Sequence, residues 1–479
     1  MQMQRILIVF MILGLTACGS DDNPTPASSD VGDLGTTDLG MADTGGFDTG
    51  SGDMGADASD MSDAGFIEDA GDMGVAEDSG IDMAVEPICP GPDCDCTVIP
   101  LPEGCPLPAS QLDVSKSSVL TSEAPTHDTF DVFLKSAPTK EVIVWVQSSD
   151  ADEAVAFPVK LVFCPPGFTE LYGRCDTVAA AEAVLGPITE ISWSRHVPIE
   201  VNGVRDNVDD GDIAYEFTFY VVSDDPIFAN SPSPKVTGTN TDIPNTSSVS
   251  RFDGLQDEAL LQAIFADESG QRELGYSGTN SARTMMFSAV DLDDQGKVEC
   301  IYTGITIDAP RESGGAIVLG FNTEHSWPQS QFDQQEPIRG DLHHLFPSEV
   351  NANSARSNYD FGMVASTSPT NPLSLVGSNA AGATVYQVRP ERRGDIARAH
   401  FYLAARYRFD TTVMNGFDDD TNALNGSVNA EEEAVLRQWN LDDPVDDLER
   451  QRNNRIEGFQ HNRNPFVDWP QLVGRIADF

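Results

Sequence analysis

Short apolar runs in the middle of the chain, separated by polar turn residues, predict β-strands. Four such runs cover residues 130–134, 142–146, 159–163 and 215–222. Each is rich in β-branched and aromatic residues, and Gly, Pro, Ser and Asp separate the runs. Several short strands joined by turns are typical of two packed antiparallel sheets. We therefore predict an all-β sandwich over residues 113–225.

A second pattern, with apolar residues at helical spacing, appears in the C-terminal half. Its first run contains Leu255, Leu260, Leu261 and Ile264. Residues 394–409 predict another helix, and His400 falls near its apolar face, as a packed histidine would. The two faces carry Ile396, Leu403 and Tyr407 on one side and Arg398, Tyr402 and Arg406 on the other. We expect an α+β domain over residues 251–479, preceded by a linker at 226–250 that is rich in Pro, Ser, Thr and Asn.

The charge of the chain is extreme and uneven. Its 479 residues include 77 Asp or Glu and 28 Lys or Arg, which gives a formal net charge of -49 at pH 7. Residues 19–88 contain no Lys or Arg and too few large apolar residues to offset the entropy of ordering, so we predict a disordered acidic linker there. A strongly acidic chain repels nucleic acid at long range. Any nucleic-acid groove must therefore be a local feature, for which the C-terminal third supplies arginines.

The first 18 residues have the features of an export signal. Arg5 precedes an apolar run at 6–15 that is too short to span a bilayer as a mature helix. The box Leu-Thr-Ala-Cys that ends at Cys18 resembles a lipoprotein signal, which implies cleavage before Cys18 and lipid on its thiol. An ordinary secretory peptide with an incidental cysteine is the alternative. We expect an exported outer-membrane lipoprotein, at the cell surface or on the periplasmic side.

Export makes disulfides permissible. Residues 89–112 form a Pro-rich stub whose cysteine spacing lacks two Cys-x-x-Cys pairs, so two disulfides are favoured over zinc, with a connectivity that the sequence does not define. The cysteines of the stub are Cys89, Cys94, Cys96 and Cys105. Cys164 and Cys175 flank an insertion in the sandwich and are expected to pair.

One loop of the sandwich is acidic. The segments 120–124, 134–139 and 203–215 resemble Calx-beta-type repeats of bacterial surface proteins. That resemblance implies a Ca²⁺ site in the matching loop, and closely spaced carboxylates suit a hard cation. The candidate ligands are Asp206, Asp209, Asp210 and Asp212. A solvated acidic turn is the alternative interpretation.

Residues 322–358 concentrate the side chains that phosphodiester cleavage requires. A single Mg²⁺ needs only one or two oxygen ligands from the protein, and a neutral histidine can act as general base. Glu324 and His325 are adjacent, so they would face metal and water separately. A helix that begins near Asn351 would present Asn353 and Arg356 together, because they are one turn apart.

These clusters resemble the bacterial endonuclease I family, which are secreted or periplasmic nucleases with a ββα-metal (His-Me) finger. The resemblance covers residues 251–477 in the order of the family. It rests on the segments at 302–304, 322–330, 341–348, 353–359, 393–399, 401–404, 439, 443–446, 449–450 and 462–468. It implies that Glu324 and Asn353 hold one Mg²⁺ and that His325 activates water.

The same resemblance places arginines near the substrate. Arg356 and Arg398 are expected at the catalytic site, and Arg463 and Arg393 at a substrate-binding position. Arg356, Arg398 and Arg463 can instead pair with Asp341, Asp395 or Asp468 and brace the fold. His343 and His344 are expected to orient the metal ligands, and Asn462 and Asn464 to act as caps. Cys300 is the one cysteine of this domain, so it has no disulfide there.

The sequence thus predicts a multidomain, lipid-anchored, exported endonuclease. Its expected substrate is DNA, with RNA as a further candidate, cleaved with little sequence preference because contacts to the backbone carry no base identity. The resemblance implies products with a 5′-phosphate. The sandwich would be a spacer or attachment module, and no obligate protein partner is evident. The alternative is a calcium-binding surface adhesion lipoprotein with an inactive nuclease-like domain. A phosphodiesterase for another extracellular ester is a further candidate.

Overall fold

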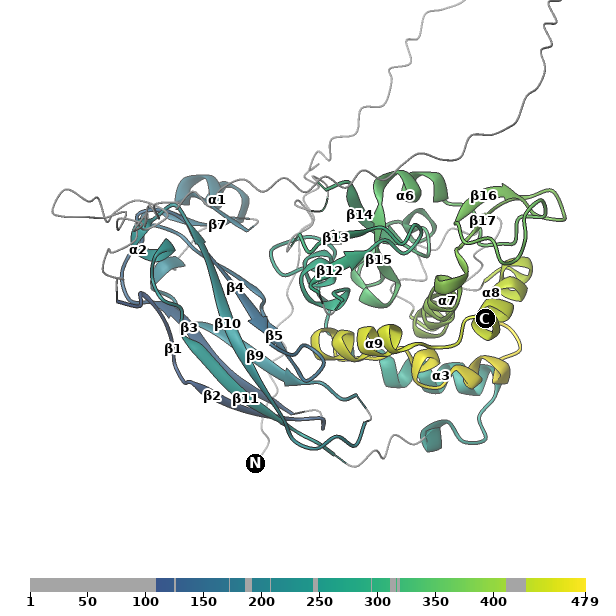
Figure 1. Ribbon diagram of the computed structural model, residues 1–479, viewed down its shortest axis with the longest axis horizontal. Helices are drawn as coiled ribbons and strands as arrows, with labels where there is room; N and C mark the ends of the chain where they lie inside the picture. The colour runs from purple at the N-terminus through teal and green to yellow at the C-terminus, as the bar shows by residue number, and fades with distance from the viewer. Residues whose placement is uncertain are drawn as a thin grey trace, which may run out of the picture. The chain divides into compact units, whose positions relative to one another are not determined.

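The computed structural model describes residues 109–479, except for 125, 172, 186–191, 207, 244–248, 294, 311–315, 317–318 and 411–427. The predictions for the signal, the acidic linker, the cysteine-rich stub and Cys18 lie outside these residues. Within them, a β-rich region is followed by an α+β region, as the sequence predicts (Figure 1).

The β-rich region contains two main sheets. One has four strands in the order β1-β3-β9-β5, and the other has five in the order β2-β11-β10-β4-β6. Only the β2–β11 pair within them is parallel among the described strands. The bounds are β1 Leu112–Val114, β2 Ser118–Ser122, β3 His127–Leu134, β4 Val142–Ser148, β5 Ala154–Phe157, β6 Lys160–Phe163, β9 Val197–Gly203, β10 Ile213–Ser223 and β11 Lys235–Thr241. Smaller elements are the pair β7 Phe168–Leu171 and β8 Arg174–Thr177, with α1 Val178–Leu185, the turn Ser192–Ser194 and α2 Pro226–Ala229.

Alternate side chains of both sheets meet in one apolar core, which includes Phe130, Val144, Phe217 and Val236. The predicted pairing of Cys164 with Cys175 is confirmed, with an S–S distance of 2.03 Å.

The prediction of a linker at 226–250 is wrong over much of its length. β11 lies in this segment and pairs with both β10 and β2. Every second residue of the strand is buried, as expected for an inner strand. One of these buried residues is Asn240, and Thr occupies three of the other positions, so the sequence resembles a polar connection.

The α+β region combines helices with short two-stranded sheets. Its helices are α3 Asp257–Glu268, α4 Ala282–Met285, α6 Val350–Arg356, α7 Arg393–Tyr407, α8 Ala430–Asp442, α9 Asp447–Gln460 and α10 Pro465–Asp468. Its strands are β12 Lys297–Glu299, β13 Thr306–Asp308, β14 Phe321–His325, β15 Leu345–Glu349, β16 Leu375–Ser378 and β17 Thr384–Gln387. Short 3-10 or π turns are Val249–Phe252, Met286–Val290, Gln329–Phe332, Ile338–Gly340, Leu342–His344, Pro390–Arg392 and Pro470–Arg475.

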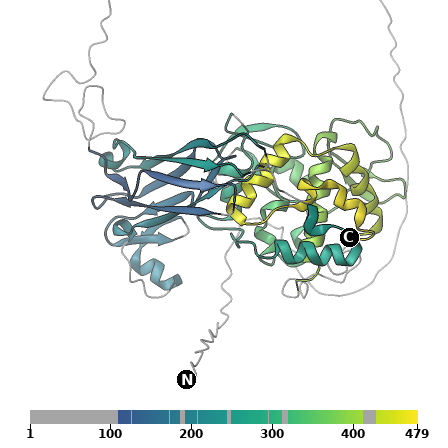
Figure 2. The ribbon, with the colours of Figure 1, turned by 90° about the horizontal axis from the view of Figure 1, so that it is seen from below.

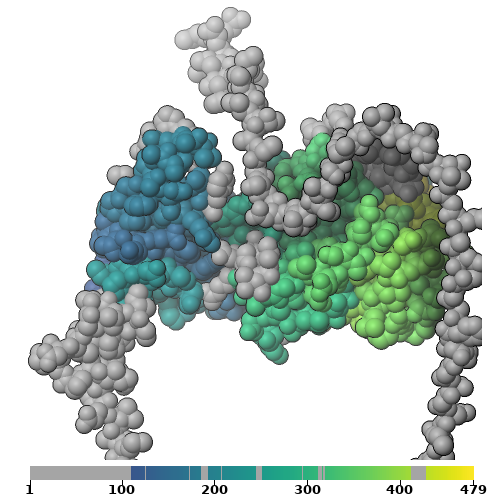
Figure 3. All heavy atoms as spheres, turned by 90° about the horizontal axis from the view of Figure 1, so that it is seen from above, coloured from purple at the N-terminus to yellow at the C-terminus, as the bar shows by residue number. Residues whose placement is uncertain are grey.

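The antiparallel strands β14 and β15 and the following helix α6 form a ββα unit. Glu324 pairs with Phe346 and His325 with Leu345, and α6 begins directly after β15. Seen from above, the green segments, which include α6 and the β16–β17 hairpin, form much of the exposed face of this region (Figure 3). Seen from below, the yellow C-terminal helices lie on the same face as α3 (Figure 2).

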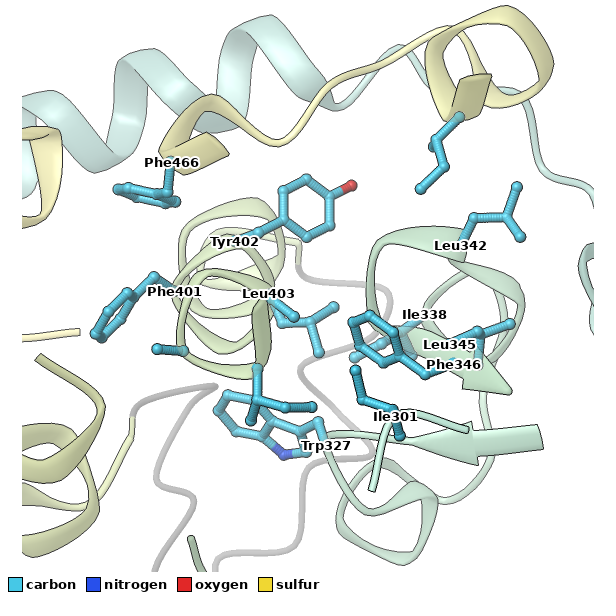
Figure 4. Packing of buried hydrophobic residues seen from close by; sticks show 14 of the residues in the cluster. Ile301, Trp327, Ile338, Leu342, Leu345, Phe346, Phe401, Tyr402, Leu403 and Phe466 are labelled. Atoms are coloured by element: carbon cyan, nitrogen blue, oxygen red, sulfur yellow. The ribbon is translucent and has the colours of Figure 1, made fainter. Parts of the chain in front are cut away.

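Helix α7 lies at the centre of the α+β region. Tyr402 and Leu403 project toward the strand and turn residues Leu342 and Leu345, while Phe401 lies on the other side near Phe466 (Figure 4). The sequence predicts the helix correctly, but all fifteen of its residues are buried. Its polar face is covered because neighbouring carboxylates and carbonyls accept hydrogen bonds from its arginines. None of the described helices has the length and apolar character needed to cross a membrane.

Candidate active site

Strand β14 carries Glu324 into the interior. The Glu324 side chain is 2% exposed, and its Oε1 accepts a 2.8 Å hydrogen bond from the Tyr302 hydroxyl. Nε of Arg356 lies 3.2 Å from the same oxygen. Burial raises the pKa of Glu324 to about 7, whereas Arg356 and Tyr302 act to lower it. One carboxylate oxygen is thus bound on the protein side, and none of the described residues donates a hydrogen bond to Oε2.

Asn353 is brought to the same face of β14 by helix α6. Its Nδ2 donates to Oδ1 of Asn322 at 2.9 Å and to the carbonyl of Thr323 at 3.0 Å. Asn322 and Glu324 are two residues apart in a strand, so their side chains share one face. Both bonds use the nitrogen of the amide, and Oδ1 accepts no hydrogen bond from the described residues. The carboxamide is therefore fixed with an oxygen available as a ligand.

His325 ends β14 and is held by a turn. Its Nε2 lies 3.1 Å from the carbonyl oxygen of Arg339, which can only accept a hydrogen bond. Nε2 therefore carries the proton, and Nδ1 keeps a lone pair. Burial lowers the pKa of the His325 imidazole well below its usual range, and nearby His344 acts in the same direction. The imidazole is neutral at physiological pH, which is the form that a general base requires.

Arg356 is 1% exposed and lies against Glu324 rather than in solvent. Its Nη2 donates to the carbonyl of Ser326 at 2.6 Å and its Nη1 to that of Ser357 at 3.0 Å. The guanidinium is thus joined to both strand β14 and the end of α6.

The other three arginines named from the sequence also have protein partners. Arg398 is fully buried and forms an ion pair with Glu449, Nη2 to Oε2 at 2.5 Å. Arg463 is bidentate with Asp468, at 2.8 and 2.7 Å. Arg393 donates to the backbone carbonyls of residues 388 and 369. For Arg398 and Arg463, the structure contains the pairing alternative, although Glu449 rather than an aspartate is the main partner of Arg398.

The other histidines and asparagines named from the sequence are buried and make contacts within the protein. Nε2 of His344 lies 2.7 Å from the carbonyl of Ile338, and its ring lies 5.3 Å from that of His325. His343 contacts the Tyr402 ring, and His400 stacks on Trp327, as a packed histidine. Further residues with the expected structural place are Asn464, which caps α10, and Asn462, which donates to the Tyr402 hydroxyl.

Sequence reasoning gave no role to Tyr302, Glu449 or Asn440, although the first two lie within the quoted motifs. Tyr302 donates to Glu324, and Asn440 accepts from Arg398 at 3.2 Å. Their contacts join segments that are 22 to 51 residues apart in the sequence. The local spacing of apolar residues gives no indication of such contacts.

A second group of acidic residues lies at one end of the sandwich. Ligand oxygens of Glu153, Asp206 and Asp210 are all within 4.8 Å of one another. Asp209 and Asp212 are exposed and are not part of this group. Burial raises the pKa of Glu153 to about 7, and neighbouring aspartates add to the effect. The structure thus brings together two of the four predicted candidates and adds Glu153, which lies 53 positions before Asp206 in the sequence.

Comparison with known proteins identifies the α+β region. The family model described as Endonuclease I matches residues 269–471. An extracellular ribonuclease of Bacillus subtilis (strain 168) is 33% identical over 231 residues, which is 47% of this chain and 76% of that protein. An extracellular deoxyribonuclease of Aeromonas hydrophila is 28% identical over 136 residues, 28% of this chain and 52% of that protein.

The β-rich region has a weaker counterpart among solved structures. The periplasmic chaperone SfaE covers 30% of this chain and 64% of its own, with 6% identity and a TM-score of 0.19. These values are too low to support a shared fold. The family match covers the region that holds Glu324, His325 and Asn353. The chain belongs to the endonuclease I family of nucleases.

Proposed function

We propose that the protein is an exported endonuclease that hydrolyses phosphodiester bonds of DNA and RNA with little sequence preference. The observation that carries this proposal is the ββα unit. It fixes the Glu324 carboxylate and the Asn353 carboxamide on one face of β14 and holds the adjacent His325 neutral. A rival in which the domain is an inactive part of a surface adhesin gives no reason for this arrangement.

The donor atoms fit one Mg²⁺. Magnesium prefers oxygen ligands and is commonly held by one or two protein groups together with water and substrate phosphate. Glu324 offers Oε2 and Asn353 offers Oδ1, each on a side chain whose other polar atom is already bonded. Bound there, the ion would stabilise the charge that develops on the phosphoryl and leaving oxygens.

The residues of the chain supply the proton transfer. His325 accepts a proton from the attacking water on Nδ1, because Nε2 is occupied by the Arg339 carbonyl. The water oxygen forms a bond to phosphorus, and the bond from phosphorus to the 3′ oxygen breaks. The 3′ oxygen takes up a proton from solvent water and His325 releases its proton to solvent, so the products are a 5′-phosphate and a 3′-hydroxyl.

For the buried arginines we propose a structural role, which the sequence left open as the alternative for Arg356, Arg398 and Arg463. Arg356 positions Glu324 and joins α6 to β14, while Arg398 and Arg463 brace the fold through Glu449 and Asp468. Arg393 supports the loop before α7 through backbone carbonyls. Direct phosphate contact by these four would require each to leave a buried partner.

Relatives named as ribonucleases and relatives named as deoxyribonucleases both support a specificity that includes RNA and DNA. The two Bacillus relatives are named ribonucleases and align over 231 and 230 residues. Three Aeromonas relatives are named deoxyribonucleases, two extracellular and one periplasmic. Recognition of the backbone explains how one scaffold serves both substrates, since phosphates do not encode the base.

The test uses the full chain with supercoiled plasmid and, separately, ribosomal RNA in Mg²⁺. We expect degradation of both, its loss in EDTA, and a fall of about 10²- to 10⁴-fold in His325→Ala. His127→Ala, which removes an exposed histidine of the sandwich, is the matched control and should be fully active. If the wild-type chain leaves plasmid and RNA intact with metal present, the protein is not this nuclease.

Export and attachment form a separate part of the proposal. The lipoprotein box ending at Cys18 supports an outer-membrane lipid anchor. Expression of the wild type and Cys18→Ala in a Gram-negative host separates the possibilities. The wild type should fractionate with membranes, and the variant should not; equal fractionation would exclude lipid attachment at Cys18.

The sandwich is proposed to bind Ca²⁺ at Glu153, Asp206 and Asp210. The support is the close approach of three carboxylate oxygens from two separate loops. Asp209 and Asp212, which the sequence also nominated, lie outside this group.

A further inference from the structure

Nearly all arginines described in the nuclease region form hydrogen bonds or ion pairs within the protein. Among the described residues from 249 to 479, Arg283 and Arg339 are the two whose guanidinium groups make no hydrogen bond and no ion pair. In each of them the Nε atom is buried without an acceptor. Both side chains are only half-buried, so their outer nitrogens can reach a ligand. In a chain of net charge -49, two uncompensated guanidinium groups in one place need an explanation.

Both guanidinium groups lie on the ring of Tyr276. The Cζ atom of Arg339 is 4.4 Å from the ring centroid, and that of Arg283 is 4.9 Å from it. Cation–π contact at these distances orders the side chains without using their N–H donors. The Tyr276 ring is in turn 4.9 Å from the ring of His325. The three residues therefore form a cationic and aromatic platform beside the general base.

The platform is built into the same turn that holds His325. Arg339 accepts from His325 through its carbonyl while its guanidinium lies on Tyr276. Gly340 lets this turn approach the Tyr276 loop: a Cβ there would lie 2.8 Å from the carbonyl carbon of Gly275 and 3.0 Å from the amide nitrogen of Tyr276. The loop also closes on α4, since the amide of Ala282 donates to the Gly275 carbonyl at 2.9 Å. Backbone and side-chain contacts thus join the platform directly to the turn that holds the base.

Two carboxylates, Glu336 and Glu273, lie near the platform and interact with each other. Oε1 of Glu336 accepts from the amide of Tyr276 at 2.8 Å, and it lies too far from Arg339 to form an ion pair. Burial raises the pKa of Glu336, and Arg339 opposes that rise. The two guanidinium groups therefore do not create a large net positive charge here; what they offer a phosphate is N–H donors that no protein acceptor uses.

We propose that Arg283 and Arg339, ordered by Tyr276, bind a backbone phosphate of the nucleic-acid strand next to the bond that is cut. The inference rests on the proposed nuclease function and names the residues that position its substrate. A guanidinium fork donates two hydrogen bonds to one phosphate, so the contact is independent of the base.

The test compares Arg283→Gln and Arg339→Gln in the full chain with Arg450→Gln. Arg450 is the matched control, because it is half-exposed and paired with an exposed aspartate away from the platform. We expect each platform variant to raise KM about tenfold with a small change in kcat. The slope of log KM against log salt should fall by about 1 for each lost phosphate contact, and the control should keep the wild-type slope.

Binding without turnover gives a second readout. In the His325→Ala background, Arg339→Gln should weaken binding of a single-stranded oligonucleotide and reduce its salt dependence, whereas Arg339→Lys should keep the salt slope and lose part of the affinity. Thermal unfolding of every variant is measured as well. If a Gln variant does not fold, the corresponding Lys variant is compared with the wild type instead. If the wild type cleaves and the platform variants keep its KM and salt slope, the proposed phosphate contact is wrong and the proposed nuclease function still stands. A wild type that does not cleave would overturn the proposed function.

Discussion

The carboxylate of Glu324 and the guanidinium of Arg356 form an ion pair inside the protein, with Oε1 and Nε 3.2 Å apart and both side chains at most 3% exposed. The pair binds only one face of the carboxylate, because Tyr302 donates to the same oxygen. A charge at this depth is tolerated since it has both a counter-ion and a hydrogen bond. The arrangement leaves the second oxygen without a hydrogen-bond donor among the described residues, and the metal is proposed to bind there.

A double-mutant cycle tests this pairing. Arg356→Met leaves the Glu324 carboxyl buried without its counter-ion and should cost about 3 to 5 kcal/mol in the free energy of unfolding. Glu324→Gln should cost a similar amount for the opposite reason. The double variant should be more stable than the sum of the single losses predicts, because neither charge is then left alone.

Activity measurements on the same variants distinguish the role of Glu324 from that of Arg356. Glu324→Gln should lose activity at every Mg²⁺ concentration, while Arg356→Lys should keep part of it and require more Mg²⁺. Urea unfolding and a Mg²⁺ titration of plasmid cleavage give both measurements. Additive stability losses would show that the two residues are not coupled.

His400 gives a prediction for acid stability. Burial lowers its pKa to about 3, against an ordinary value of 6.5. Between pH 6.5 and about 3, the imidazole is therefore protonated in the unfolded chain but stays neutral in the folded chain. The stability that the neutral His400 contributes is fully present above pH 6.5 and is lost as pH falls toward 3. His400→Phe keeps the ring between Trp327 and Phe361 and removes the titration.

We expect His400→Phe to match the wild type at pH 7 and to be more stable by roughly 2 to 3 kcal/mol at pH 4.5. Buried carboxyls such as Glu432, whose pKa is raised to about 8, act in the opposite direction with pH. They are common to both proteins, so the difference isolates the imidazole. Equal pH dependence of chemical unfolding in the two would contradict the prediction.

The acidic group of the sandwich predicts a calcium effect on stability. At 100 times its dissociation constant, Ca²⁺ should stabilise the folded chain by about 2.7 kcal/mol. Glu153→Gln and Asp206→Asn should each remove most of the Ca²⁺-dependent rise in Tm. Asp209→Asn, an exposed aspartate of the same loop, should keep it. A wild-type Tm that does not respond to Ca²⁺ would exclude the site.

The sequence predicted the local part of the active site and missed its distant part. Glu324, His325 and Asn353 lie within one ββα unit, so strand alternation and helical spacing were enough to place them on a common scaffold. Tyr302 and the platform residue Arg283 come from segments that reach the site only through tertiary packing. Their sequence neighbourhood contains no periodic signal for such a contact.

The same limit explains the errors in the fold. Most strands and helices follow their apolar periodicity, as in β10 and α3. β11 was missed because Thr and Asn make up much of it, and its pairing with β10 and β2 on either side depends on tertiary contacts that the local sequence does not reveal. In α7 the polar face was expected to be a functional surface, but Glu449 covers Arg398.

The sandwich was expected to be a spacer, yet it contributes to the core of the nuclease region. Trp145, Val155, Val159 and Val204 belong to the same buried cluster as residues of α3 and α9. Arg455 of α9 is bidentate with Asp152, at 2.7 and 3.0 Å. These contacts bury apolar surface and a charge pair that the nuclease region cannot satisfy by itself.

We therefore predict that the nuclease region loses stability when it is produced from residue 251 onward. Removal of the sandwich exposes the cluster around Ile456 and Phe459 and leaves Arg455 without its carboxylate, so Tm should fall by several degrees and cleavage should decline with it. In the full chain, Val155→Ala should lower the unfolding temperature of the nuclease region, followed by loss of activity on heating. Val132→Ala is the control, because it is equally buried but belongs to the core between the two sheets. A truncated chain with the Tm and activity of the full protein would show that the sandwich is a spacer after all.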